Sequence, residues 1–202
     1  MRVESVSVDS VIVYFEQIVS EDILNMVQNS YYRLKELDGI VELTPSYCSI
    51  LVRYDIGVYS HIEIKNKIVE TLKNKTTKSI IKKPKTVKIP TRYNGIDLDR
   101  VANYNNLTIE DVIKLHTQKI YRVYAIGFMV GFAYLAKVDT KIAAPRLSTP
   151  RTKVPKGSVA IADNQTAIYP KESAGGWNII GETLFDRFEE FNIGDFVQFE
   201  RI

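Results

Sequence analysis

The feature that most constrains the fold is a change of character along the chain. Apolar residues recur at helical spacing in the segments 20–37 and 60–73. After Tyr121, glycines, prolines and β-forming residues alternate, and no long helical period appears. The 202 residues are enough for one large domain or two small ones. Because the two stretches differ in kind, we expect two small domains that divide near Thr91.

The first stretch predicts alternating strands and helices. Ser20 is expected to cap the first helix and Gly39 to end it. Four segments rich in β-forming residues are expected to be strands: 10–15, 40–43, 48–54 and 86–90. With the two helices between them, the order is β-α-β-β-α-β, as in a ferredoxin-like, split βαβ unit. We therefore expect residues 1–91 to form an α+β, ferredoxin-like domain.

The second stretch, residues 92–202, predicts a mainly β domain. Short helices are expected at 97–103 and 109–115, the second capped by Thr108. The expected strands are 121–128, 158–162, 166–169, 177–181 and 196–201. No internal repeat is visible. Short strands separated by long, glycine- and proline-rich loops are typical of a β barrel or sandwich.

Cysteine and histidine are too scarce for several classes of site. A single cysteine and two histidines exclude an internal disulfide framework, a cysteine-based zinc cluster and a His-rich metal site, so no metal is expected. Cys48 lies in an alternating stretch, which favours a small buried hydrophobe over a nucleophile. There is no apolar run of about 20 residues and no signal-peptide pattern. We expect a cytoplasmic protein without membrane contact.

The net charge of +3 conceals an uneven distribution. Residues 65–88 hold nine lysines and one acid, Glu70, so the rest of the chain is acidic overall. A basic surface for nucleic acid is one interpretation. The window contains no aromatic residue and no arginine, which favours a solvated helix face and linker instead. We therefore expect no nucleic-acid partner.

The residues with chemical potential concentrate between positions 116 and 183. Pro145-Arg146 and Pro150-Arg151 repeat at a spacing of five, and each proline restricts the backbone before its arginine. Guanidinium groups held in this way suit a carboxylate or a phosphate. The alternative is that the arginines tie loops of the domain together. Gly175-Gly176 is expected to serve a tight turn or a close backbone approach.

Three motifs in this region carry a family resemblance. They are GFxxGFAYL from Gly127, PRxxTPRxxVPxGSVAI from Pro145, and NQTxIYPxESxGGWxxIGxT from Asn164. Together they resemble the KipI / PxpB family, which is also called allophanate hydrolase subunit 1. That family is similar to one half of the urea carboxylase carboxyltransferase domain. The match is strongest over residues 90–202, and the order of elements expected before it agrees.

The resemblance implies a fold, partners and a reaction. The fold would be a cyclophilin-like β barrel over residues 92–202 beside a separate N-terminal domain. The partner would be a KipA / PxpC-type subunit. With a LamB/YcsF-type (PxpA) subunit, these proteins form a bacterial 5-oxoprolinase that opens 5-oxoproline to glutamate using ATP. This chain would then be the B component of a hydrolase, inactive alone, and whether ATP contacts it stays open.

The implied chemistry assigns roles to particular residues. Phosphorylation would activate the lactam carbonyl before hydrolysis, and the charge developing on that oxygen needs fixed donors and cations. Proton transfer needs an acid–base group, a role for which His116 is the candidate. The expected catalytic residues are His116, Arg146, Arg151 and Gln165, and the expected substrate-binding residues are Tyr169, Glu172 and Trp177.

Two other functions stay open. KipI inhibits autophosphorylation of a sensor histidine kinase, and an exposed patch of Phe128, Met129 and Phe132 would bind such a partner. The alternative for these residues is a buried barrel core. The third possibility is a subunit related to urea carboxylase or allophanate hydrolase. The sequence has no Ala-Met-Lys-Met biotin signature, so any carboxyl carrier would lie on another chain.

The sequence departs from the family pattern at several loop positions. Val130 and Ala174 stand where proline is usual, and Ala136-Lys137 and Asp163-Asn164 replace glycines. These changes alter loop shape more than charge. They leave the substrate open among 5-oxoproline, urea, allophanate and others, and they do not affect the expected fold. The oligomeric state is also undecided by the sequence.

Overall fold

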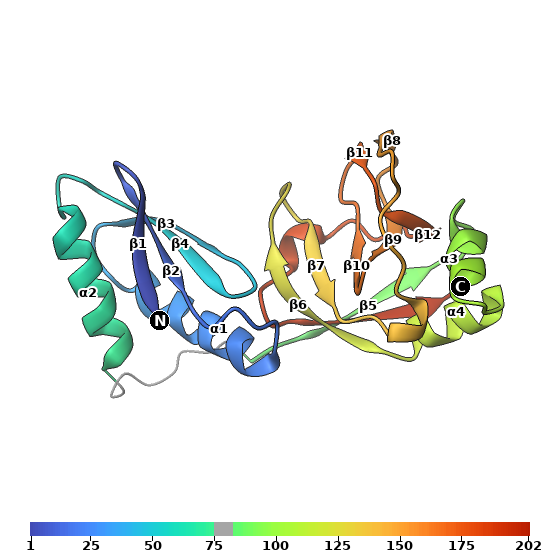
Figure 1. The fold of residues 1–202 in the computed structure, drawn as a ribbon, viewed down its shortest axis with the longest axis horizontal. Helices are drawn as coiled ribbons and strands as arrows, with labels where there is room; N and C mark the ends of the chain where they lie inside the picture. The colour runs from blue at the N-terminus through green and yellow to red at the C-terminus, as the bar shows by residue number, and fades with distance from the viewer. Residues whose placement is uncertain (75–82) are drawn as a thin grey trace. The chain divides into compact units, whose positions relative to one another are not determined.

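The computed structural model describes residues 1–74 and 83–202 and divides the chain into two compact units (Figure 1). The first unit is Met1–Lys83 and the second is Pro84–Ile202. Residues 75–82, which hold part of the lysine-rich window, lie outside the described residues. No helix in the described ranges is both long and apolar enough to cross a membrane.

The first unit is an α+β fold with one four-stranded sheet. Its elements are β1 (Arg2–Ser7), β2 (Ser10–Tyr14), α1 (Glu21–Lys35), β3 (Ile40–Pro45), β4 (Ser49–Tyr54) and α2 (His61–Lys73). The strand order is β1-β2-β4-β3, and neighbouring strands are antiparallel. Ser20 caps α1 by accepting a hydrogen bond from the Ile23 N–H, as predicted. Ser60 and Glu63 form a capping box at the start of α2.

Alternation along the central strands builds the core of this unit. Val11 and Val13 on β2 and Ile50 and Val52 on β4 are fully buried. They form one cluster with the apolar residues of both helices, Ile64 among them. Cys48 belongs to the same buried cluster, as its alternating context predicted. The apolar residues that alternate along the strands therefore pack against the apolar faces of the two helices, as the sequence pattern predicts.

The prediction that residues 86–90 complete the sheet of the first unit is wrong. Residues 86–90 lie in β5 (Thr86–Thr91), which pairs in parallel with β13 (Phe196–Arg201) in the second unit. The edge beside β2 is taken by β1, which the sequence pattern does not predict because most of its residues are exposed and give no apolar alternation. The order β-α-β-β-α-β is thus not formed by the expected residues. The compact units also divide before Pro84, ahead of the boundary expected at Thr91.

The second unit is built on a seven-stranded mixed sheet. Its remaining elements are α3 (Leu98–Tyr104), α4 (Ile109–Thr117), β6 (Ile120–Ile126), β7 (Ala133–Ala136), η1 (Thr140–Ile142), β8 (Arg151–Val154), β9 (Ser158–Ala162), β10 (Gln165–Ile168), β11 (Ser173–Gly175), β12 (Asn178–Glu182) and η2 (Phe188–Glu190). The order is β12-β9-β10-β7-β6-β13-β5, and β8 and β11 form a separate two-stranded ribbon. Both helices pack on this sheet at one end of the unit (Figure 1).

A short bridge brings the two edges of this sheet together. Arg92, just after β5, exchanges two backbone hydrogen bonds with Glu182 at the end of β12, at 2.9 and 2.8 Å. The sheet is therefore a nearly closed barrel, which confirms the expected β barrel. Its interior is filled by an apolar cluster that includes Val123, Leu135 and Phe199. The cyclophilin-like assignment of this barrel stays a prediction.

Two glycines allow the edges to approach at this seam. A Cβ atom at Gly95 would lie 2.3 Å from the Ile179 carbonyl oxygen, and one at Gly181 would lie 2.4 Å from the Arg92 carbonyl oxygen. Both obstacles are backbone atoms, which cannot move aside as a side chain can. Close backbone approach therefore requires glycine at both positions.

We expect Gly95→Ala to destabilise the protein by about 2 kcal/mol, because the added methyl group forces the seam apart. Gly127→Ala is the matched control, since a Cβ there meets nothing within 4 Å. Chemical denaturation of both variants measures the difference. Equal stability of the two variants would contradict the role given to the seam.

Candidate functional site

Aromatic side chains from the β6–β7 hairpin and the start of β12 line a pocket of about 230 Å³, called here the aromatic pocket. Phe132 lies at its centre. The Phe132 ring makes edge contacts with four others, at centroid distances of 4.9–5.8 Å. The lining residues are Phe128, Phe132, Tyr134, Arg146, Pro150, Tyr169, Ala174, Gly175, Gly176 and Trp177. Three of the residues predicted to be catalytic or to bind substrate thus meet here, namely Arg146, Tyr169 and Trp177, together with Phe128 and Phe132, which are predicted to bind a partner.

Arg146 supplies the positive charge of the pocket. Its guanidinium carbon lies 5.6 Å from the centre of the Trp177 ring, within the range of a cation–π contact. The Arg146 residue is exposed, whereas Trp177 is buried. Among residues 1–74 and 83–202, no acidic side chain forms an ion pair with Arg146. Its hydrogen-bond donors therefore remain available at the pocket.

Two phenols face this charge. Burial raises the pKa of both Tyr134 and Tyr169, while the charge of Arg146 opposes the rise. For Tyr169, a hydrogen bond with the Trp177 backbone opposes it as well. Both hydroxyl groups are thus protonated at neutral pH.

Gly175 makes room for one of these phenols. A Cβ atom at Gly175 would lie 2.3 Å from the Tyr169 hydroxyl oxygen. The close approach expected for the Gly175-Gly176 pair is confirmed at its first residue. At Gly176 the nearest contact, Pro150, would be at an ordinary 3.6 Å.

The tip of the β6–β7 hairpin forms one wall of the pocket. Phe128 has a φ angle of +70°, a conformation that bulky residues rarely adopt, and 64% of it is exposed. Backbone strain of this kind is often found at functional sites. Phe132, in contrast, is 2% exposed and Met129 packs against the pocket cluster. Of the three residues expected to bind a partner protein, only Phe128 is widely exposed.

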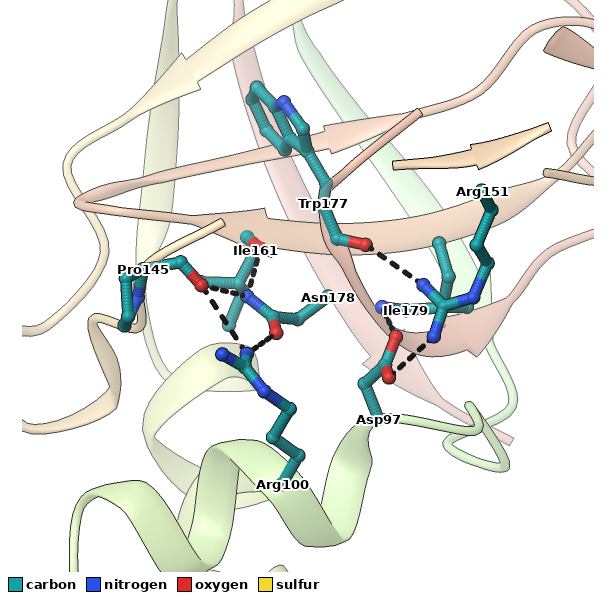
Figure 2. Close-up of polar contacts among 8 residues, drawn as sticks. All are labelled: Asp97, Arg100, Pro145, Arg151, Ile161, Trp177, Asn178 and Ile179. Carbon is teal, nitrogen blue, oxygen red and sulfur yellow. Dashed lines mark hydrogen bonds and ion pairs between the residues drawn. The ribbon is translucent and has the colours of Figure 1, made fainter. Parts of the chain in front are cut away.

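Arg151 is held by a buried acid instead of facing the pocket (Figure 2). Its Nη2 atom lies 2.7 Å from Oδ1 of Asp97, and its Nη1 donates to the Trp177 carbonyl at 3.5 Å. The second oxygen of Asp97 accepts a hydrogen bond from the Ile179 backbone N–H at 2.7 Å. Because Asp97 is 5% exposed, this ion pair is shielded from water. Arg151 thus links the β8–β11 ribbon to β12. This agrees with the alternative interpretation of the sequence, in which the arginines hold loops of the domain together.

A second polar cluster is built around Asn178, the residue after Trp177 (Figure 2). Asn178 is fully buried, and its Nδ2 donates to the Pro145 carbonyl at 3.0 Å and to the Ile161 carbonyl at 2.9 Å. Arg100 donates to the Asn178 side-chain oxygen and, at 3.3 Å, to the same Pro145 carbonyl. Asn178 follows Trp177 and Pro145 precedes Arg146. The cluster therefore fixes the backbone beside both members of the Arg146–Trp177 pair.

Sequence reasoning misses Asp97, Arg100 and Asn178 as site residues. Asp97 stands at the N-cap of α3, where an aspartate is expected to cap the helix, yet its side chain makes no capping bond. It is engaged with Arg151, which is 54 residues away in the sequence. No local pattern reveals such a partner.

His116 lies in the barrel core, away from the pocket lining. It is fully buried, and burial lowers its pKa to about 3, so the imidazole is neutral. The Tyr93 hydroxyl is 2.7 Å from Nδ1, and Thr166 Oγ1 is 2.9 Å from Nε2. Since Thr166 donates onward to the Ala160 carbonyl at 3.0 Å, it accepts from Nε2–H, and Nδ1 accepts from Tyr93. Both ring nitrogens of His116 thus have partners in the core, which favours a structural role, and proton transfer by His116 stays a prediction.

The structure does not bring the other two predicted residues to the pocket lining. Gln165 begins β10, opposite Ala136 and Ala162 in the neighbouring strands. Glu172 is exposed and forms a surface ion pair with Lys153 at 3.4 Å. Within the described residues, no group of three or more His, Cys, Asp or Glu side chains is placed to hold a metal ion.

Comparison with known proteins places this chain in a known family. The family described as carboxyltransferase domain, subdomain C and D, matches residues 1–192, and the chain belongs to it. A relative in Bacillus subtilis, the B component of 5-oxoprolinase, is 33% identical over 223 residues, covering 100% of this chain and 92% of the relative.

Solved structures agree on the fold. TTHA0988 is 32% identical with a TM-score of 0.82, and the match covers 96% of this chain and 40% of that one. This chain thus spans well under half of TTHA0988. The urea carboxylase of Kluyveromyces lactis has a TM-score of 0.74 at 16% identity, with 96% of this chain and 21% of that one covered, which shows a shared fold alone.

We expect Asp97→Ala to cost about 3 kcal/mol of stability, because it leaves the Arg151 charge and the Ile179 N–H without their buried partner. Asp99→Ala, an exposed acid in the same helix, is the control and should change stability by less than about 0.5 kcal/mol. Denaturant unfolding followed by circular dichroism measures both. A loss at Asp97 no larger than at Asp99 would contradict the clamp.

The burial of His116 predicts a specific pH dependence. Its folded pKa of about 3 lies below its ordinary value of 6.5, so the unfolded chain binds a proton that the folded chain excludes. The stability from neutral His116 is complete above pH 6.5 and falls as pH drops toward 3, by at most about 1.4 kcal/mol per pH unit.

Denaturation at several pH values between about 7 and 4 tests this for the wild type and His116→Gln. The variant lacks the titrating ring, so the stability difference between the two proteins should shrink as pH falls. Parallel curves would contradict this, because they would show that His116 binds its proton as readily in the folded as in the unfolded state.

Proposed function

We propose that this chain is the B component of an ATP-dependent 5-oxoprolinase, which opens 5-oxoproline to glutamate. The observation that carries the proposal is the relationship to the corresponding 5-oxoprolinase component of Bacillus subtilis, which extends over the whole of this chain. The pocket adds chemical support. A guanidinium and two phenols around an aromatic floor suit a small polar substrate whose carbonyl oxygen gains charge.

The roles of the two arginines differ in this proposal. Arg146 is the cation that meets substrate, because no acidic side chain neutralises it within the described part of the chain. Arg151, whose charge is already paired with Asp97, positions Trp177 and β12. The phenol of Tyr169 is the hydrogen-bond donor that we propose beside Arg146. A catalytic role for Gln165 would require it to act from β10, outside the pocket lining.

ATP does not fit the aromatic pocket. The volume of about 230 Å³ is too small for a nucleotide, and Arg146 is the single cationic residue among the described residues of its lining, too little for a triphosphate. No step of the mechanism is therefore assigned to ATP on this chain. We propose that ATP binds outside this pocket, and whether it contacts another part of this chain stays open.

The partners in this proposal are a KipA / PxpC-type subunit and a LamB/YcsF-type (PxpA) subunit. The TTHA0988 chain continues well beyond the part that matches this one, which is compatible with a further component that we propose is a separate protein here. The exposed hairpin tip, with Phe128 and Val130 at 64% and 86% exposure, is the contact that we propose for that protein.

The same tip favours a second candidate, inhibition of a sensor histidine kinase. Exposed apolar side chains on a hairpin are suited to the face of a helical bundle. This candidate predicts binding by the chain alone, without its partners in the hydrolase. An autophosphorylation assay of purified kinase with added chain tests it.

The test of the main proposal is reconstitution. The chain is co-expressed with both partners, and glutamate release from 5-oxoproline is measured with and without ATP. We expect release only when this chain, both partners and ATP are present. Release in the absence of this chain would contradict the proposal. So would an inactive complete complex, above all if the chain alone inhibits the kinase.

A further inference from the structure

We propose that the aromatic pocket binds a small ring-shaped carboxylic acid, with the carboxylate on Arg146 and the ring against Trp177 and Phe132. The inference deepens the proposed function and rests on it for the choice of 5-oxoproline as the probe. The recognition chemistry itself follows from the pocket. It has one guanidinium, aromatic walls and room for one small molecule.

Arg146 is the arginine whose donors are left for a ligand. Three arginines lie around Trp177, and two are already engaged. Arg151 pairs with Asp97, and Arg100 donates to Asn178 and Pro145. Within the described residues, the Arg146 guanidinium lies over the Trp177 ring and near the phenols of Tyr134 and Tyr169, and no carboxylate pairs with it. A planar guanidinium offers paired N–H donors that match the two oxygens of a carboxylate.

The pocket holds this donor group in place before a ligand arrives. The Pro145 carbonyl, one residue before Arg146, accepts hydrogen bonds from both Asn178 and Arg100. The Trp177 ring beneath the guanidinium is 5% exposed and lies within the aromatic cluster. Binding to a backbone and a ring that are already fixed loses little conformational entropy.

The walls set the size and shape of the ligand. Phe132, Tyr169 and Trp177 are all nearly fully buried, so they present fixed ring faces and edges. A volume of about 230 Å³ admits a five- or six-membered ring with one carboxylate and excludes a nucleotide. The phenol of Tyr169, whose pKa is raised by burial so that it is protonated at neutral pH, provides a donor for a carbonyl on such a ring.

Trp177 makes the binding directly measurable. It is the only tryptophan in the chain, so intrinsic fluorescence reports on this pocket alone. Full-length chain is titrated with 5-oxoproline, and we expect a saturable change in Trp177 emission. 2-Pyrrolidinone has the same lactam ring without the carboxylate. It should bind at least about tenfold more weakly, because it leaves the guanidinium without its partner.

Variants test the assignment of the carboxylate. Arg146→Gln should weaken 5-oxoproline binding at least about tenfold, and Arg146→Lys should retain part of the affinity because it keeps the charge but loses the fork. Arg187→Gln is the matched control. Its guanidinium carbon lies 5.7 Å from the Phe185 ring, a similar cation–π contact outside the pocket, so the titration should be unchanged. Thermal unfolding establishes that each variant is folded.

Three results would overturn the inference: no saturable change with 5-oxoproline, equal binding of 2-pyrrolidinone, or unchanged binding by folded Arg146→Gln. The reconstitution assay separates this failure from failure of the proposed function. Binding without glutamate release in the complete complex sinks the function and leaves the pocket assignment standing. Glutamate release without binding here sinks only the pocket assignment.

Discussion

The buried carboxylate of Asp97 is the interaction on which the rest of the second unit depends. A charged group with 5% exposure is tolerated only when both of its oxygens are satisfied. Here one oxygen pairs with Arg151 and the other accepts the Ile179 N–H. The Asp97 backbone N–H also donates to the Ile179 carbonyl at 2.9 Å, so one residue joins the start of α3, the ribbon and β12. The barrel seam at Gly95 lies two residues away.

This arrangement separates structural from ligand-facing charges. Arginines near one another in a sequence look equivalent, and Pro145-Arg146 and Pro150-Arg151 differ by only five positions. The fold assigns Arg151 to a buried acid and leaves Arg146 above the Trp177 ring at the pocket. A single neighbouring carboxylate therefore decides which guanidinium is available for a ligand.

Interactions between residues close in the sequence made part of the fold predictable. Caps at Ser20 and Thr108 and the helices behind them follow from short-range patterns, and the structure confirms them. The β barrel follows from turn residues between short strands. Two arginines with restricted backbones pointed to a site for a carboxylate or a phosphate, and one of them, Arg146, lines a pocket together with Trp177.

Contacts between residues far apart in the chain could not be predicted from the sequence. The strand Thr86–Thr91 has an apolar alternation that fits either sheet, and its parallel partner lies at the far end of the chain. His116 sits at the end of an amphipathic helix, where the pattern does not say whether a side chain faces water or the core. Its burial, and hence its neutral state, depends on Tyr93 and Thr166 from other elements.

The most direct test of this account is a crystal structure of the chain with 5-oxoproline bound. We predict the carboxylate within hydrogen-bond distance of the Arg146 guanidinium, with the ring against Trp177 and the Arg151–Asp97 ion pair intact. A carboxylate bound to Arg151, with Asp97 displaced, would contradict the division of roles between the two arginines.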